Sequence, residues 1–256
     1  EAMTPNEYRS VLATAKTIAL DTFNLDVVFV KHDQWDIDEF FAPHRTGIGT
    51  DRAIEARMLP IEPDSADALV EGLAEFYERT SAEEIRAAVR NQEDADRIDL
   101  AKDKNAMFRQ VADLHIQKLM EMQTIILADG RPLLLHDLYN EYMAWSYIVR
   151  HQSRYDLILT NQLIASAEAY GTAIHSSMRG GITSGFSDQA PTRHGGAVVM
   201  TTYPFIGKAR FFTASRGGDY DSQTAVECVA YLILHELGHM IMHFGHHYDH
   251  PGCVMR

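Results

Sequence analysis

The chain has 256 residues and is 46% hydrophobic, so it can bury the core of one substantial domain or of two small ones. Its 23 Lys and Arg against 36 Asp and Glu give a net charge of −13 at pH 7, which repels a phosphate backbone and argues against a nucleic-acid partner. No apolar run approaches the roughly 18 residues of a membrane-spanning helix, so we expect no membrane span.

The sequence leaves the compartment open. Two cysteines are too few for a small disulfide scaffold, and we expect a soluble protein. A start at Glu1 rather than at an initiator Met is compatible with export and removal of a targeting segment.

Helical spacing predominates in the first two thirds of the chain. Apolar residues three and four apart, behind Thr4 and Pro5, predict a capped helix over residues 5–20. The β-branched and aromatic run at 25–30 predicts a short strand, and residues 31–63 read as irregular. Further helices are expected at 65–80, 81–90, 104–127, 133–150 and 155–178.

The pattern changes after residue 179. Five glycines and Pro191 predict a loop over 180–196, and the apolar runs at 197–203 and 210–214 predict two strands. A helix is expected to begin near Asp221 or Ser222, and its residues 226–234 are nearly all apolar. We therefore predict an α+β fold, mostly helical with a small mixed sheet.

Histidines concentrate near the C-terminus. Six of the 13 fall within sixteen residues: His235, His239, His243, His246, His247 and His250. On a helix, His235 and His239 leave one face about 6 Å apart, so both can bind one Zn²⁺ at ~2.0 to 2.1 Å. Glu236 is placed to take a proton from water on the zinc and to pass it to a leaving amine. The pattern predicts a zinc metalloprotease that hydrolyses peptide or protein substrates.

A peptidase zinc needs a third protein ligand, which we expect downstream. His243 would lie about 12 Å along a straight helix from His235, too far to share one ion. We expect the helix to break at Gly245 and the chain to turn back, which presents His246 as the third ligand. The alternatives are His247, His250 and Asp249.

The segment 235–255 resembles the metzincin zinc endopeptidases, whose pattern is H-E-x-x-H-x-x-G-x-x-H followed by a turn with a methionine beneath the metal. Its ending, Cys253-Val254-Met255, is most similar to archaemetzincins and their bacterial relatives. The resemblance implies a zincin-type active-site helix and Met255 as the turn methionine. It also implies His235, His239 and His246 as zinc ligands and Glu236 as the base.

The spacing departs from that family. The family glycine falls on Met242 and its third histidine on Gly245, so this chain has one extra residue between the second and third ligands. Two alternatives stay open: a gluzincin-type peptidase with a carboxylate third ligand, and an inactive zinc-binding regulatory protein.

The expected organisation is a mainly helical region over 1–178 and a catalytic zinc-binding portion over 179–256, packed as one unit. Because the predicted strands 197–203 and 210–214 lie just upstream of the zinc helix, we expect one of them to line the cleft. An extended substrate would then pair with its main chain.

Overall fold

The computed structural model describes residues 3–30, 34–48, 66–90, 98–99, 101–126, 129–133, 135–151, 154–170, 173–178, 181–183, 197–208, 213, 216–242, 244–245 and 253–255. The chain forms two compact units: unit 1 is residues 1–51, 141–164 and 178–256, and unit 2 is residues 52–140 and 165–177. This differs from the expected division after residue 178, because residues 1–51 cluster with the C-terminal helix and not with 52–140.

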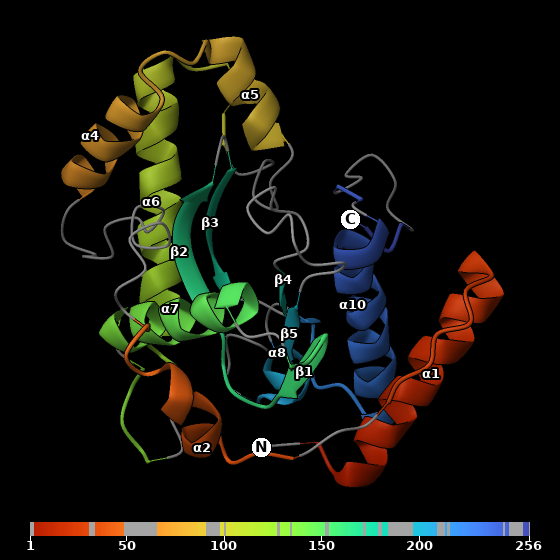
Figure 1. Cartoon of the computed structure of the whole chain (residues 1–256). Coiled ribbons are helices and arrows are strands. Elements are labelled where there is room, and N and C mark those ends of the chain that lie inside the picture. The colour runs from red at the N-terminus through yellow and green to blue at the C-terminus, as the bar shows by residue number, and fades with distance from the viewer. Residues whose placement is uncertain are drawn as a thin grey trace. The chain divides into compact units, whose positions relative to one another are not determined.

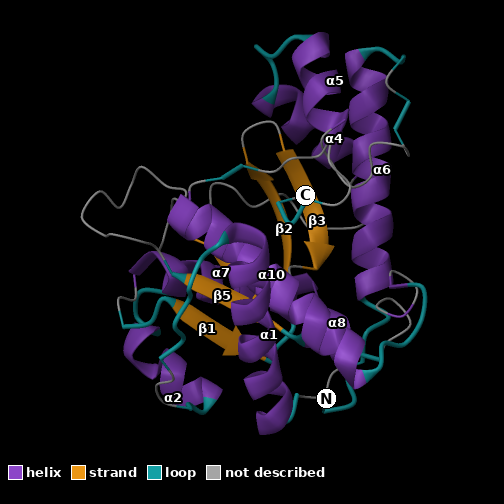
Figure 2. Ribbon diagram, turned by 90° about the vertical axis from the view of Figure 1, so that its right-hand side faces the viewer, coloured by secondary structure: helices purple, strands orange, loops and turns teal. Residues whose placement is uncertain are grey.

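The predicted α+β class, mostly helical with a small mixed sheet, is confirmed (Figures 1 and 2). The described helices are α1 (Pro5–Phe23), α2 (Ile37–Phe41), the 3-10 helix η1 (Ala42–His44), α4 (Ala66–Phe76), α5 (Ala82–Arg90), α6 (Lys104–Met122), α7 (Leu135–His151), α8 (Tyr203–Ile206) and α10 (Ser222–Met242). The described strands are β1 (Leu157–Thr160), β2 (Ala165–Tyr170), β3 (Ala173–Met178), β4 (Gly181–Thr183) and β5 (Val198–Thr201).

Three local predictions were wrong. Residues 25–30 form no strand: Val28 and Val30 are 71% exposed, and no strand partner pairs with this segment in the described sheets. Residues 155–178 are not a helix but hold β1, β2 and β3, because pairing with neighbouring strands overrides a weak helical pattern. The segment 180–196, predicted to be a loop, contains the strand β4 near its start.

The strand predicted at 210–214 is not tested, because these residues lie outside the described ones except for Thr213.

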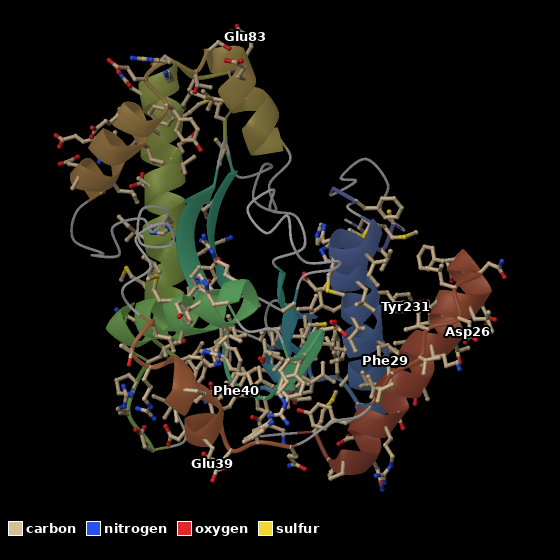
Figure 3. The ribbon with its side chains drawn as sticks, in the orientation of Figure 1. Asp26, Phe29, Glu39, Phe40, Glu83 and Tyr231 are labelled. Atoms are coloured by element: carbon tan, nitrogen blue, oxygen red, sulfur yellow. The ribbon has the colours of Figure 1, made fainter. Side chains whose placement is uncertain are left out.

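Unit 1 is built from a three-stranded sheet and two long helices. Its strand order is β1-β5-β4, with β5 parallel to β1 and antiparallel to β4. All four residues of β5 are buried, and α10 packs on β4 and β5. Helix α1 packs along α10, and Phe29, labelled in Figure 3, adds to the same core. The core therefore lies directly behind one face of α10.

Local sequence signals set both ends of α1. Thr4 and Glu7 form a capping box at its start, in which the Glu7 carboxylate accepts the Thr4 backbone N–H at 2.7 Å. Asn24, in the left-handed conformation, ends the helix. Glu7 also accepts a hydrogen bond from the Ser222 hydroxyl at 2.5 Å, which ties the start of α1 to the start of α10.

The start of α10 is fixed by two side chains. The Asp221 carboxylate accepts the Thr224 backbone N–H at 2.7 Å, which confirms the predicted N-terminus. Upstream, the Arg216 side chain is 7% exposed, and its guanidinium donates to the carbonyls of Pro204 (2.8 Å) and Gly207 (2.9 Å). The segment after β5 and the segment before α10 are thereby joined.

Unit 2 has its own apolar core between α4, α5 and α6. The rings of Tyr77 and Phe108 stack with centroids 5.8 Å apart. Lys104, at the start of α6, donates its ammonium protons to the backbone carbonyls of Tyr77 and Thr80, which follow α4. In the same unit, β2 and β3 pair as a two-stranded sheet.

Candidate metal centre

Helix α10 carries the predicted motif on its buried side. Glu236 is 7% exposed and His239 is 8% exposed, while His235 is half-buried. The same side of the helix also buries Val229, Ile233 and Met240 against the core of unit 1. The motif is thus held on a helix whose rotation is fixed by packing.

The two imidazoles converge as the spacing predicts. The Nε2 atoms of His235 and His239 lie 3.1 Å apart, and the ring planes are nearly perpendicular, at 87°. Two nitrogens bound to one tetrahedral Zn²⁺ at ~2.0 to 2.1 Å lie about 3.4 Å apart. The observed separation therefore fits a pair of ligands to one ion.

Backbone carbonyls fix the tautomer of both rings. His235 Nδ1 donates to the Val254 carbonyl at 2.7 Å, and His239 Nδ1 donates to the Phe244 carbonyl at 2.6 Å. A carbonyl oxygen can only accept, so each Nδ1 carries the proton and each Nε2 carries a lone pair. Metal-binding histidines are oriented in this way, by a hydrogen bond from the ring nitrogen that does not face the metal.

Two lone pairs at 3.1 Å repel each other unless a cation or a proton lies between them. Burial lowers the pKa of His235, with His239 acting in the same direction and the hydrogen bond to Val254 opposing both. A lowered pKa favours the neutral His235 ring at pH 7. Among metal ions, a pair of neutral imidazoles suits Zn²⁺ and its transition-metal neighbours.

Glu236 points at strand β4. Its Oε1 lies 2.5 Å from the position that a β-carbon would occupy at Gly181, and its Cδ lies 2.7 Å from that position. The carboxylate therefore rests directly on the backbone of β4, where only glycine leaves room for it.

The C-terminal segment closes against the other side of the helix. Met255 is 2% exposed, and its sulfur lies 2.5 Å from the position of a β-carbon at Gly238. The Met255 backbone N–H donates to the Cys253 sulfur at 3.4 Å, and the Val254 carbonyl holds His235. The Cys253-Val254-Met255 segment thus supports the first histidine and packs beneath the helix.

The third ligand cannot be placed from the described residues, because His243, His246, His247, Asp249 and His250 all lie outside them. Within the described part of the chain, no three His, Cys, Asp or Glu side chains gather as a metal-binding group. Helix α10 ends at Met242, three residues before the expected break at Gly245, and the Phe244 N–H turns back to the Gly238 carbonyl at 3.2 Å.

The sequence did not predict the contact of Gly181 with Glu236, nor the carbonyls of Phe244 and Val254 as acceptors for the two histidines. The Phe244 and Val254 carbonyls belong to the backbone, so the type of side chain at these positions does not reveal their hydrogen bonds to the histidines. The glycine-rich stretch around Gly181 predicts a loop and gives no sign of the close approach between this strand and the Glu236 carboxylate.

Helix α10 is also, by length and composition, the one helix in the described regions that could cross a membrane, with a mean hydropathy of 1.3. The hydropathy is that of an 18-residue stretch within the helix, and 56% of this stretch is buried inside the protein. Burial of this kind is also found in the core helix of a protein that spans no membrane.

The chain matches no known family model, no curated protein and no solved structure.

Proposed function

We propose that this protein is a zinc-dependent metalloendopeptidase of metzincin-like design, with His235 and His239 as metal ligands and Glu236 as general base. The observation that carries the proposal is the pair of Nε2 atoms 3.1 Å apart, each presented by a ring whose Nδ1 donates to a backbone carbonyl. His246 is the third ligand of the proposal. The metzincin-like reading is supported by Met255 beneath the helix at Gly238.

When bound, zinc supplies Lewis acidity that polarises a peptide carbonyl and lowers the pKa of water. The proton transfers are made by a residue of the chain itself. Glu236, one residue from the first ligand, accepts a proton from the attacking water and delivers it to the amine that leaves. Its burial against β4 limits the positions that the carboxylate can take, so little orientational freedom is lost in the reaction.

Strand β4 is the better place for the substrate main chain than the strands expected from the sequence. Strand β5 (within the predicted 197–203) is flanked by β1 and β4, so its backbone is already paired on both sides. Strand β4 stands at the end of the described strand order and touches the Glu236 carboxylate. In the proposed complex, an extended peptide adds to the outer edge of β4 and its scissile bond lies over Glu236.

The test compares wild type with Glu236→Gln on a peptide library, with zinc measured by elemental analysis. We expect one zinc per chain in both, and turnover lower by about 10² to 10⁴-fold in the variant. The matched control is Glu227→Gln, an exposed glutamate on the same helix, which should keep wild-type turnover.

Removal of zinc with a chelator should abolish hydrolysis, and added zinc should restore it. A chain that binds one zinc but cleaves no library member would be the zinc-binding regulatory protein instead. A chain that binds no zinc would refute the metal centre itself.

A further inference from the structure

Residues 25–30, which the sequence predicts as a strand, keep strand-like features in the structure although they have no strand partner. Exposure alternates along the segment: Val27 and Phe29 are partly buried, whereas Val28 and Val30 are both 71% exposed. An extended chain produces a period of two, since its successive side chains point to opposite sides. Phe29 packs against the core of unit 1, so one side of the segment faces that core and the other faces water.

The backbone of this segment is unpaired. After the end of α1, the Leu25 N–H donates to the Ala19 carbonyl at 3.1 Å. Within the described part of the chain, the N–H and carbonyl groups of residues 27–30 form no hydrogen bond. Backbone groups that find no partner in the protein bond to water, so this row of donors and acceptors is open to solvent. Such a row is a template on which another chain can pair.

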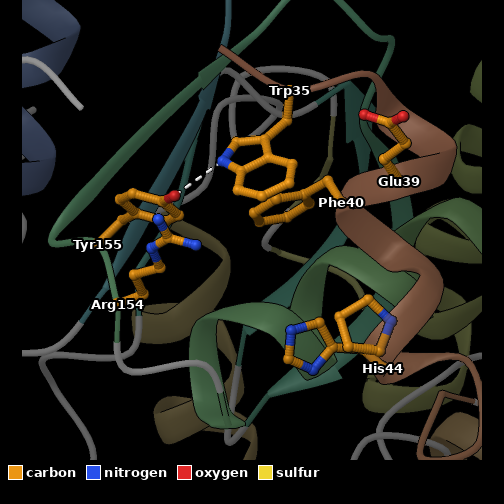
Figure 4. A pocket seen from close by; sticks show the side chains of 7 residues that line it. Trp35, Glu39, Phe40, His44, Arg154 and Tyr155 are labelled. Atoms are coloured by element: carbon orange, nitrogen blue, oxygen red, sulfur yellow. Dashed lines mark hydrogen bonds between the residues drawn. The ribbon is translucent and has the colours of Figure 1, made fainter. Parts of the chain in front are cut away.

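Contacts on both sides of the segment hold it in place. Upstream, the Lys16 ammonium lies 3.3 Å from the carboxylate of Asp26, labelled in Figure 3, which places the segment beside α1. Downstream, the Trp35 indole N–H donates to the Tyr155 hydroxyl at 2.7 Å, which attaches the chain to the residues that lead into β1 (Figure 4). The segment is therefore positioned before a partner arrives, which lowers the entropic cost of binding.

The unpaired backbone decides what kind of partner fits. A helix offers only its side chains, and the hydrocarbon of a bilayer offers no hydrogen-bonding groups. Either would cover Val28 and Val30 but would leave the N–H and carbonyl groups beside them unpaired. An extended chain covers the side chains and pairs the backbone at the same time. The partner that fits is therefore a strand.

We infer that this strand is the same segment of a second copy of the chain, paired antiparallel about a two-fold axis. A two-fold interface brings the same patch of both subunits together, so one unpaired segment is sufficient. The outward Val28 and Val30 side chains of the two copies then lie on one face of the joined ribbon, where β-branched residues pack well.

Charge favours this contact over the rest of the surface. Each copy carries a net charge of −13, which opposes association in general. Residues 27–30 are uncharged, however, and Asp26 is paired with Lys16, so the pairing brings no unpaired like charges together. Phe23 and Leu25, each 40% exposed, add apolar surface next to the segment. The inference does not depend on the proposed peptidase activity.

The test measures the mass of the protein in solution as a function of concentration, by sedimentation velocity. For the wild type we expect a shift to twice the mass of one chain between about 1 and 100 µM, as for a small interface. Val28→Lys should stay monomeric to at least about tenfold higher concentration, because a lysine on an edge strand opposes pairing. The matched control is Met120→Lys, at an apolar side chain of α6 that is 57% exposed, which should dimerise like the wild type.

Amide hydrogen exchange of the wild type separates strand pairing from a contact through side chains alone, and it decides the question even if Val28→Lys does not fold. Alternate amides within 27–30 should exchange severalfold more slowly at about 100 µM than at about 1 µM. A wild-type protein that stays monomeric up to about 1 mM would overturn the inference. A dimer whose 27–30 amides exchange as fast as in the monomer would also overturn it, as would protection that appears only when an unrelated strand-forming peptide is added.

Discussion

Gly238 and Met255 approach so closely that a β-carbon at position 238 would lie 2.5 Å from the Met255 sulfur. Gly238 lies between the two proposed ligands in the sequence, and Met255 follows the residue whose carbonyl holds His235. A change at this contact therefore reaches the proposed metal centre through the backbone of the C-terminal segment.

Gly238→Ala should push the Met255 side chain out of its site and destabilise the protein by about 1–3 kcal/mol, since a well-packed position accepts no extra methyl group. It should also weaken zinc binding, because Val254 moves with Met255. Urea unfolding and zinc titration measure the two effects. The control is Gly72→Ala in α4, where a β-carbon meets nothing within 4 Å and the helix should gain up to about 1 kcal/mol. Equal stability changes in the two variants would contradict the contact.

Gly181→Ala should displace the Glu236 carboxylate, which would lie only 2.5 Å from the new methyl group. Since a displacement of about 1 Å can cost 10²-fold in rate, we expect turnover to fall roughly 100-fold with zinc content unchanged. Peptide hydrolysis and elemental analysis check this. Gly72→Ala in α4, where an added β-carbon meets nothing within 4 Å, should keep wild-type turnover. Full activity in Gly181→Ala would show that Glu236 does not act from this position.

The third ligand is tested by single alanine variants. His246→Ala should lower zinc affinity by orders of magnitude, whereas His243→Ala should change it little, because only a residue beyond a chain reversal can approach the ion from the side opposite His235 and His239. Zinc titrations of these two variants, and of His247→Ala and His250→Ala, decide between the candidates. Loss of the metal in His243→Ala with retention in His246→Ala would rule out the metzincin-like ligand set.

Unit 2 should lose stability in alkali through Tyr77. Burial raises the pKa of Tyr77 to about 12, against about 10 for an unfolded tyrosine. The folded state therefore favours the neutral phenol: its contribution is complete below pH 10 and is lost as the pH rises from 10 through 12, a change of roughly 2–3 kcal/mol at most. Urea unfolding between pH 9 and 11.5 measures the loss. Tyr77→Phe should show a flatter profile over that range; an identical slope would refute the assignment.

The sequence predicted the elements in which local pattern and packing agree. The apolar run before His235 and the Asp221 cap predicted α10, and the β-branched residues of β5 predicted a strand. The convergence of His235 and His239 also followed from spacing alone, because four residues are close to one helical turn.

The failures occur where pairing between distant residues decides the structure. The alternating Ala165–Tyr170 segment contains good helix formers, yet it lies in a sheet with β3. Residues 25–30 have strand-forming side chains but no partner strand in the described sheets. The contact of Glu236 with Gly181 links residues 55 positions apart and leaves no periodic signal in either segment.

The bond between Glu7 and Ser222 spans 215 residues, and α1 packs along the helix that carries the proposed site. During synthesis, α1 must therefore wait for α10, which begins roughly 200 residues later, whereas residues 52–140 of unit 2 are made before α10. Until α10 emerges, the apolar face of α1 lacks the helix on which it packs in the folded unit and is open to aggregation or to chaperones. Among the described elements, α10, which carries the proposed metal ligands, is thus the last to be synthesised.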